Sequence, residues 1–205
     1  MTLLADQSEL GIKLGRLAAL MEARGVEALR ITQGGNLAWL SGGGDFLVSQ
    51  TGAPVAEMLL YNGKLTLITN AIEASRLEQE ELFGGVEVQA FDWFDEGEKE
   101  RLTASIVGEA RTMDDGELDL YPARVPLLEV ERARFRGLGK LASTTLTDAL
   151  TGLVPGLSEK EVAARVKAAV EARGMACPVL LVAGQERLGK YRHPIPKGEP
   201  FGAIG

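Results

Sequence analysis

The dipeptide Asn62-Gly63 is the sequence feature that most constrains the fold of this chain. It separates residues 58–61, MLLY, from residues 64–69, KLTLIT, and both runs are rich in residues that favour strands. Asn-Gly readily adopts the positive φ angles that a two-residue turn between antiparallel strands requires. The sequence therefore predicts a β-hairpin, and with it a sheet against which the neighbouring segments can pack.

Helical and strand-like segments alternate on both sides of this hairpin. The hydrophobic patterns predict helices over residues 8–24, 71–83 and 95–113, and strands over residues 26–32, 86–91 and 117–122. Such alternation is typical of an α/β domain, in which we expect a mixed sheet. A connector with two prolines, residues 121–126, ends this part of the chain. We therefore divide the chain into one domain over residues 1–124 and a second over residues 125–205.

The second part opens with a long predicted helix over residues 127–153. Its apolar anchors are Leu128, Phe135, Leu138, Leu141, Leu146 and Leu150. Ser158 and Glu161 then have the spacing of a capping box, in which each residue bonds a free backbone N–H of the other. This spacing predicts the start of another helix, and Gly174 is placed to end it.

An apolar run, CPVLLVAG, occupies residues 177–184 and ends in a glycine. Its length and composition predict a strand that is buried on both faces. We expect Cys177, the only cysteine, to be a buried small hydrophobe rather than a nucleophile. A loop over residues 185–192 then leads to His193, the only histidine.

The segment from residue 17 to residue 42 follows the pattern L-x-x-x-M-E-x-R-G-V-E-A-L-x-I-T-x-x-x-N-L-A-W-L-S-G. It resembles the start of the creatinase and prolidase N-terminal domain. In that family a helix leads to a strand, and an N-h-x-[YW]-L-[ST]-G element follows, here as a short helix or turn over residues 36–43. The matching positions are Asn36, Trp39, Leu40, Ser41 and Gly42.

Residues 127–200 carry a second resemblance. A helix, the motif PG-x-S-E-x-E-V, another helix, a short strand ending in glycine, a loop and H-P-x-P follow in this order. The order resembles the opening half of the pita-bread catalytic domain of Xaa-Pro aminopeptidases, prolidases, methionine aminopeptidases and creatinase. It implies a partial α+β domain after the α/β domain, as the first half of an incomplete catalytic domain.

The family resemblance also implies a chemistry. In the metallopeptidases of this family, two Asp, one His and two Glu bind a pair of divalent metals, which activate a water for amide hydrolysis. All five ligands lie downstream of the histidine that matches His193. We therefore expect no metal and no other cofactor in this chain, and a divalent metal of the Mn, Co or Zn type only if a missing C-terminal half supplies the ligands.

His193 matches the upstream active-site histidine of the family and is our candidate catalytic residue. In the peptidases this histidine contacts substrate near the scissile bond, and in metal-free creatinase it transfers protons. An imidazole suits either role because its ordinary pKa lies near neutrality. The alternative for His193 is a hydrogen-bonded surface residue.

Tyr191, Arg192 and Trp39 are candidate substrate-binding residues. For Trp39 the alternative is core packing, and the pocket that it borders could be that of a partner subunit. The resemblance implies hydrolysis of the bond before proline in short peptides. A non-catalytic peptide-binding or dimerising relative and a metal-free creatinase-like hydrolase remain as alternatives, so whether the protein is an enzyme stays open.

The composition bears on partners and location. The net charge of −7 argues against a nucleic-acid or anionic-membrane partner, because both attract basic surfaces. A single cysteine allows no disulfide within one chain, which fits the cytoplasm. No apolar run approaches the roughly 20 residues that span a bilayer. The open sheet edge of an incomplete domain predicts a homodimer.

Acidic residues gather in two places that could suggest a metal site. They are Glu78, Glu80 and Glu81 in a predicted helix, and Asp92, Asp95, Glu96, Glu98 and Glu100 near a loop. Runs of like charge are usually solvated faces, and no EF-hand spacing is present. We therefore predict that these clusters do not bind a metal.

Overall fold

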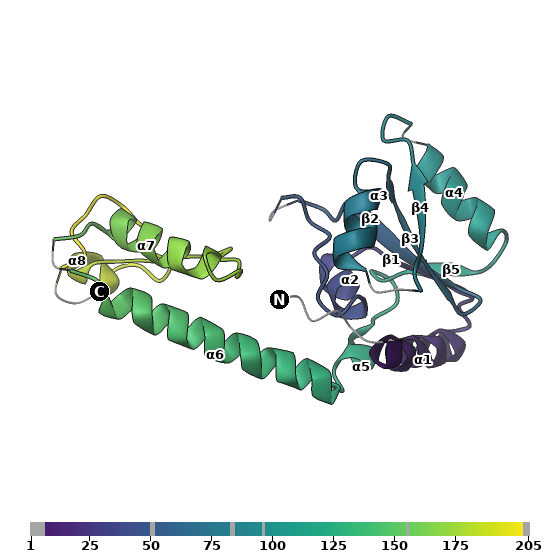
Figure 1. Cartoon of the computed structure of the whole chain (residues 1–205), viewed down its shortest axis with the longest axis horizontal. Coiled ribbons are helices and arrows are strands. Elements are labelled where there is room, and N and C mark those ends of the chain that lie inside the picture. Colours follow the sequence, from purple (N-terminus) through teal and green to yellow (C-terminus); the bar gives the residue numbers. More distant parts are fainter. Residues whose placement is uncertain (1–6, 50–51, 83–84, 96, 155, 203–205) are drawn as a thin grey trace. The chain divides into compact units, whose positions relative to one another are not determined.

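The computed structural model describes residues 7–49, 52–82, 85–95, 97–154 and 156–202. The chain forms two compact units, one up to Glu131 and the other from Arg132 onward, coloured from purple to green and from green to yellow (Figure 1). The division falls inside a helix. These units are defined by compactness and are not the domains predicted from the sequence. The domain boundary at residue 124 therefore stays a prediction.

A mixed five-stranded sheet forms the centre of the first unit. Its strands are β1 (Ala28–Ile31), β2 (Ala56–Tyr61), β3 (Lys64–Asn70), β4 (Glu87–Phe91) and β5 (Thr112–Asp114), in the spatial order β4-β3-β2-β1-β5. The pairs β1–β2 and β2–β3 are antiparallel, whereas β3–β4 and β1–β5 are parallel. The predicted hairpin is confirmed, because Tyr61 pairs with Lys64 and the turn residues Asn62 and Gly63 have φ angles of 50° and 74°.

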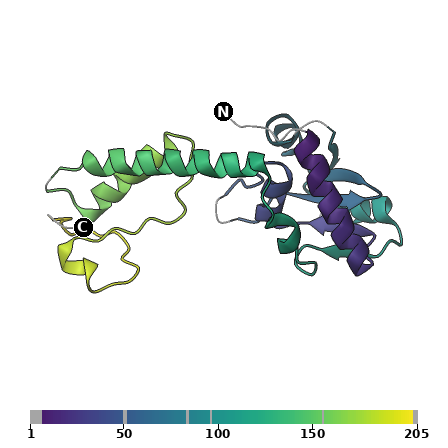
Figure 2. The same ribbon diagram turned by 90° about the horizontal axis from the view of Figure 1, so that it is seen from below.

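Helices cover both faces of this sheet (Figure 1). They are α1 (Gln7–Arg24), α2 (Gly34–Leu40), α3 (Ala74–Arg76), the π-helical turn η1 (Leu77–Glu81), α4 (Glu98–Val107) and α5 (Tyr121–Arg124). Side chains alternate along the strands, so Leu29 and Ile31 face the larger core with α1 and α2, while Ala28 faces a smaller core with α4. Figure 2 shows α1 lying across its face of the sheet. The predicted α/β domain with a mixed sheet is confirmed.

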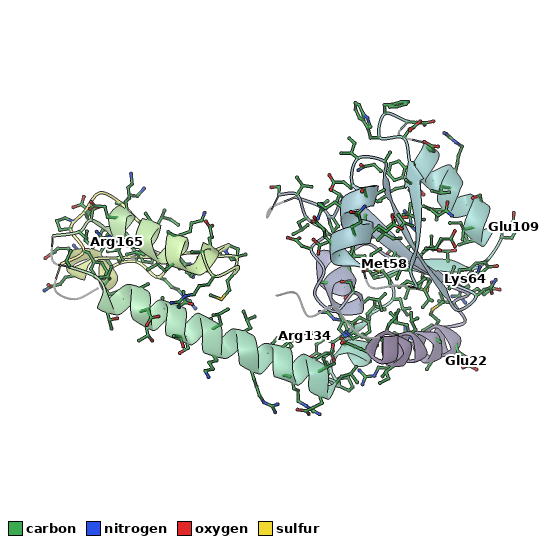
Figure 3. All side chains as sticks on the ribbon, viewed as in Figure 1. Glu22, Met58, Lys64, Glu109, Arg134 and Arg165 are labelled. Carbon is green, nitrogen blue, oxygen red and sulfur yellow. The ribbon has the colours of Figure 1, made fainter. Side chains whose placement is uncertain are left out.

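The sheet interior is filled mostly by apolar side chains. Met58 of β2, labelled in Figure 3, is fully buried. Its neighbours in the larger core include Leu29, Ile31, Leu37, Leu40, Leu60 and Leu67. Fully burying one such side chain contributes roughly 1.5–3 kcal/mol to stability. None of the helices in the described ranges is long and apolar enough to cross a membrane.

Three predicted elements of this unit are wrong in extent or type. The helix predicted over residues 95–113 ends at Val107, because Gly108 takes a positive φ and the chain then pairs with β1 as β5. The strand predicted over residues 117–122 is wrong, because residues 117–120 are irregular and α5, with a proline in its first turn, begins at Tyr121. Of the helix predicted over residues 71–83, the described residues 71–82 are helical in α3 and η1 alone, and residue 83 lies outside the described residues.

Asp115 connects the end of β5 to the start of α2. Its buried carboxylate accepts hydrogen bonds from the backbone N–H groups of Thr32 and Gln33, at 3.0 Å each. It also accepts one from the Thr32 hydroxyl at 2.8 Å and one from Asn36 Nδ2 at 2.7 Å. The Asn36 side-chain oxygen in turn accepts from Arg124 at 2.6 Å. One carboxylate thus satisfies the donors of a loop that lies far away in sequence.

The second unit contains most of α6 (Glu129–Thr151), with α7 (Glu159–Glu171) and α8 (Gln185–Leu188). The predicted long helix is confirmed as α6. Its expected apolar anchors, however, are mostly exposed, and Phe135 has 64% of its surface open. Only the end of α6 packs into the small core of this unit, which consists of Leu157, Val162, Val166 and Val182 with partly buried neighbours such as Ala149.

The strand predicted over residues 177–184 is wrong. This segment has no regular secondary structure, and Val179 is 72% exposed. A strand needs a neighbour that satisfies its backbone groups, whereas this segment donates one backbone bond of this kind within the described chain, from Val182 N–H to Pro194 O. Only residues 182–184 are buried. Cys177 is half-buried rather than buried, with its Sγ 3.7 Å from Val179 O.

Candidate functional site

The capping box at the start of α7 is present as predicted. Ser158 Oγ accepts the Glu161 N–H at 3.3 Å, and Glu161 Oε2 accepts the Ser158 N–H at 2.8 Å. The hydrogen bonds from the Ser158 backbone and hydroxyl lower the pKa of Glu161. The box satisfies backbone donors at the helix start, so the Glu161 carboxylate acts within α7 itself.

Glu159, two residues before Glu161, has a different set of partners. Its side chain is fully buried, and Oε1 accepts the Gly184 N–H at 2.8 Å. The other oxygen, Oε2, accepts the Lys197 N–H at 2.8 Å and is paired with the Arg187 guanidinium. The carboxylate therefore contacts both ends of the segment 184–197, which we call the His193 loop.

These partners determine the ionisation of Glu159. Burial alone raises the pKa of a carboxyl group, but the N–H groups of Gly184 and Lys197 and the charge of Arg187 outweigh it. The pKa of Glu159 therefore lies below its ordinary value. Because its pKa is lowered in the folded state, the ionised Glu159 carboxylate stabilises the fold. This contribution to stability is complete above the ordinary carboxyl pKa and is lost as the pH falls through the lowered pKa.

Further contacts hold the His193 loop together and attach it to the start of α7. Arg187 Nη2 donates to Ile195 O at 3.2 Å, and the Arg187 guanidinium lies 5.3 Å from the centre of the Tyr191 ring. Backbone bonds join Glu159 N–H to Glu199 O at 2.9 Å and Lys160 N–H to Lys197 O at 3.1 Å. The loop is thus attached to α7 at several points.

Gly184 allows this close approach. A Cβ atom at this position would lie 2.8 Å from Phe201 O and closer still to Pro200 O. Any larger residue would push the chain after the loop away from α7. The glycine that was predicted to end a strand is required for the passage of a second backbone segment.

The His193 loop borders a cavity of about 660 Å³. Its lining includes Glu159, Glu186, Arg187, Lys190, Tyr191, Lys197 and Glu199. Cations and carboxylates are thus both present. The predicted residues Tyr191, Arg192 and His193 lie together on the loop and are exposed, Tyr191 to 54%. Within the described residues, no hydrogen bond or ion pair of the His193 side chain is found.

Trp39 lies in the first unit, at the end of α2. It is half-buried and packs against the larger core, and Lys13 Nζ lies 5.2 Å from the centre of its ring. Its indole Nε1 is buried and has no hydrogen-bond partner in the described parts of the chain. Core packing of Trp39 is therefore observed, and its role at a substrate pocket stays a prediction.

Lys13 is fully buried beneath Trp39. Its ammonium donates to Glu9 Oε1 and to Trp39 O, at 2.5 Å each, and lies 3.2 Å from Glu131 Oε1. Glu131 in turn accepts the Leu128 N–H at 2.7 Å. Three parts of the first unit, α1, α2 and the start of α6, thus share one buried charged group.

Sequence reasoning missed Glu159, Lys13 and Asp115. Each is a charged residue that a sequence pattern assigns to solvent, because charged side chains are rarely buried without partners. The local signal was at Glu159, which directly follows the predicted N-cap and is the first glutamate of the motif PG-x-S-E-x-E-V, although the motif gave it no role. Among the described His, Cys, Asp and Glu residues, no group of three or more could hold a metal ion.

The sequence of this chain resembles that of a known protein family. A family model described as the creatinase/prolidase N-terminal domain matches residues 13–115. No curated protein matches the chain significantly.

Solved structures show a similar fold. The prolidase from Pyrococcus furiosus has a TM-score of 0.65 at 16% identity, with 92% of this chain and 62% of that chain covered. An X-Pro aminopeptidase from Thermotoga maritima has a TM-score of 0.61 at 19% identity, with 92% and 57% covered. Dipeptidase PepE from Mycobacterium ulcerans has a TM-score of 0.59 at 22% identity, with 96% and 58% covered.

The chain thus spans less than two thirds of the length of these proteins. The likeness in fold covers more than nine tenths of this chain, so it extends beyond residues 13–115 into the second unit. The sequence match covers half of the chain and includes the Asn36–Gly42 element. The chain belongs to the creatinase/prolidase N-terminal domain family.

Proposed function

We propose that the protein is Xaa-Pro aminopeptidase-like or prolidase-like and acts on short peptides with proline in the second position. The observation that carries the proposal is the cavity of about 660 Å³ lined by Tyr191, whose neighbours Arg192 and His193 are exposed on the same loop. A cavity of this size suits a small ligand such as a dipeptide. The fold similarity to an X-Pro aminopeptidase and a prolidase supports the substrate class.

The charges around the cavity suit a short peptide. A dipeptide with free ends carries an ammonium and a carboxylate. Lys190 and Lys197 offer cations for the carboxylate, while Glu186 and Glu199 offer carboxylates for the ammonium. The Tyr191 ring gives the proline ring an apolar surface. Such a contact suits proline, which has no backbone N–H to donate.

His193 is proposed to contact the peptide bond before proline. Its exposed imidazole can donate one proton or accept one, as a contact to a carbonyl oxygen or a leaving nitrogen requires. Arg192 beside it is proposed to bind the peptide. The proposal assigns no metal to the described residues, because their donors do not form a group that fits one. These residues bind and orient the peptide.

Titration with the dipeptide Ala-Pro tests this proposal. His193 is the only histidine, so its Cε1–H signal in an NMR spectrum is assigned without ambiguity. Ala-Pro is expected to shift this signal with a dissociation constant on the order of 1 mM. Pro-Ala has the same composition in the reverse order and is the control, with a much smaller shift. Equal shifts with both dipeptides, or none with either, would contradict the proposal.

A second candidate function is peptide binding without hydrolysis. The charged side chains and Tyr191 that line the cavity can bind a peptide by themselves, which supports it. Release of free proline from Ala-Pro, measured in the same samples, separates the two functions. A shift of the His193 signal without proline release identifies the binding protein. Creatine in place of the dipeptide tests the metal-free creatinase-like alternative by the same two measurements.

We also propose that the protein forms a homodimer. Exposed apolar side chains on α6, including Phe135, Leu138 and Leu141, support this, because large exposed apolar patches usually mark interfaces. Light scattering is expected to give twice the mass of one chain. The double variant F135E/L138E is expected to lower the mass to that of one chain. A single-chain mass for the unchanged protein at working concentration would rule the dimer out.

A further inference from the structure

Glu159 and Arg187 connect the predicted peptide-contacting residues to the body of the second unit. Glu159 accepts the N–H groups of Gly184 and Lys197, each at 2.8 Å, and these two residues are the ends of the His193 loop. Arg187, inside the loop, pairs with Glu159 and donates to Ile195 O at 3.2 Å. Tyr191, Arg192 and His193 lie between these attachment points.

The Glu159 carboxylate forms its hydrogen bonds with the His193 loop rather than with its own helix. A carboxylate in the first turn of a helix can gain from the helix dipole while it stays in water. Glu161 shows this local use, since its partner is Ser158. Glu159 is instead fully buried, and burying a charge is unfavourable unless partners compensate for the lost water. All the hydrogen bonds that the structure gives this carboxylate come from the His193 loop.

We propose that Glu159 and Arg187 are positioning residues that hold the His193 loop closed, and so fix Tyr191 at the cavity and His193 on the same loop. The proposal rests on the proposed function only in naming these two side chains as peptide contacts. Arg187 reaches one of them directly, because its guanidinium lies 5.3 Å from the centre of the Tyr191 ring. Without the pair, the N–H groups of Gly184 and Lys197 have no described acceptor, and the Lys197 end keeps the backbone bond from Lys160 N–H to Lys197 O.

Glu159→Gln in the full chain tests the proposal, with Glu161→Gln as the matched control. Both variants remove one carboxylate from the first turn of α7. In Glu159→Gln, amide hydrogen exchange at Gly184, Tyr191 and Lys197 is expected to accelerate by about tenfold or more, because charge-assisted bonds are lost. The His193 Cε1–H signal is expected to shift, because the loop that carries this side chain loosens. In Glu161→Gln, faster exchange is expected only in the first turn of α7, with the His193 signal unchanged.

Two results would overturn the proposal. In one, Glu159→Gln leaves loop exchange and the His193 signal as they are in the unchanged protein. In the other, both variants change the loop equally, which would assign Glu159 to helix stability alone. If Glu159→Gln does not fold, Arg187→Lys replaces it, because lysine keeps the charge but lacks the two separate guanidinium nitrogens that bond Glu159 and Ile195 O. For Arg187→Lys, faster amide hydrogen exchange at Tyr191, with the amides of α7 still protected, supports the proposal. Unchanged amide exchange at Tyr191 refutes it.

These measurements need no peptide, so they are independent of the proposed function. If the loop responds as expected but Ala-Pro does not bind the unchanged protein, the proposed function fails and the positioning role stands. If Ala-Pro binds, Glu159→Gln is expected to weaken its binding several-fold, and Glu161→Gln is not. Equal affinities in all three proteins would contradict a positioning role in binding.

Discussion

Replacing Asp115 by alanine is expected to destabilise the first unit by about 3–5 kcal/mol. The carboxylate accepts four hydrogen bonds, from two backbone N–H groups, the Thr32 hydroxyl and Asn36. Alanine removes the acceptor and leaves these donors without it in a place that water hardly reaches, since Asp115 is 5% exposed. The free energy of unfolding in urea, followed by tryptophan fluorescence, measures the loss. Both tryptophans, Trp39 and Trp93, lie in the first unit, so the signal reports this unit alone.

Asp119→Ala is the matched control for this prediction. Asp119 is exposed, and its carboxylate accepts one N–H, that of Tyr121, at 2.9 Å. Its loss is expected to change stability by no more than about 1 kcal/mol. If the two variants destabilise the unit equally, Asp115 does not have the role that its contacts assign to it.

The elements that could be predicted from the sequence have local causes. The hairpin depends on two adjacent residues that accept positive φ, and the capping box depends on two side chains three residues apart. The family element from Asn36 to Gly42 could also be recognised, because its pattern is contiguous. For such features the causes and the consequences lie within a few residues.

The elements that were predicted wrongly depend on distant partners. Residues 112–114 form β5 rather than the end of a helix, because they pair with β1 more than 80 residues earlier. Residues 177–184 are as apolar as a buried strand but have no strand beside them in the described chain. The hydrophobic pattern indicates which secondary structures a segment can adopt. Whether it forms a strand depends on a neighbouring strand that can pair with it.

The candidate site shows the same division. His193 and its neighbours were found from a contiguous motif, and the structure places them together on one loop. Glu159 was missed because its partners Gly184 and Lys197 lie 25 and 38 residues away. Two of its three partners act through backbone N–H groups, which leave no mark in the sequence. Gly184 is the partial exception, since a glycine beside an apolar run can indicate a close backbone approach.

Replacing Lys13 by methionine is the second change with a large expected effect, a destabilisation of the first unit by about 3–5 kcal/mol. The ammonium is fully buried and within 3.2 Å of Glu9, Glu131 and Trp39 O. Methionine fills a similar volume but leaves two buried carboxylates without this cation. Urea unfolding followed by tryptophan fluorescence is again the measurement. Lys64→Met, at the exposed start of β3 (Figure 3), is the control and is expected to change stability by less than about 0.5 kcal/mol.

A double-mutant cycle with Glu131→Gln separates the charge interaction from simple loss of packing. Glu131 lies 3.2 Å from Lys13 and also accepts the Leu128 N–H, so it joins α1 to the start of α6. Once Lys13 is methionine, neutralising Glu131 removes an uncompensated buried charge. The double variant is therefore expected to be more stable than the sum of the two single losses predicts, by about 1–3 kcal/mol. Additive losses would show that Lys13 stabilises the unit by filling space, and that the buried charges do not connect α6 to α1.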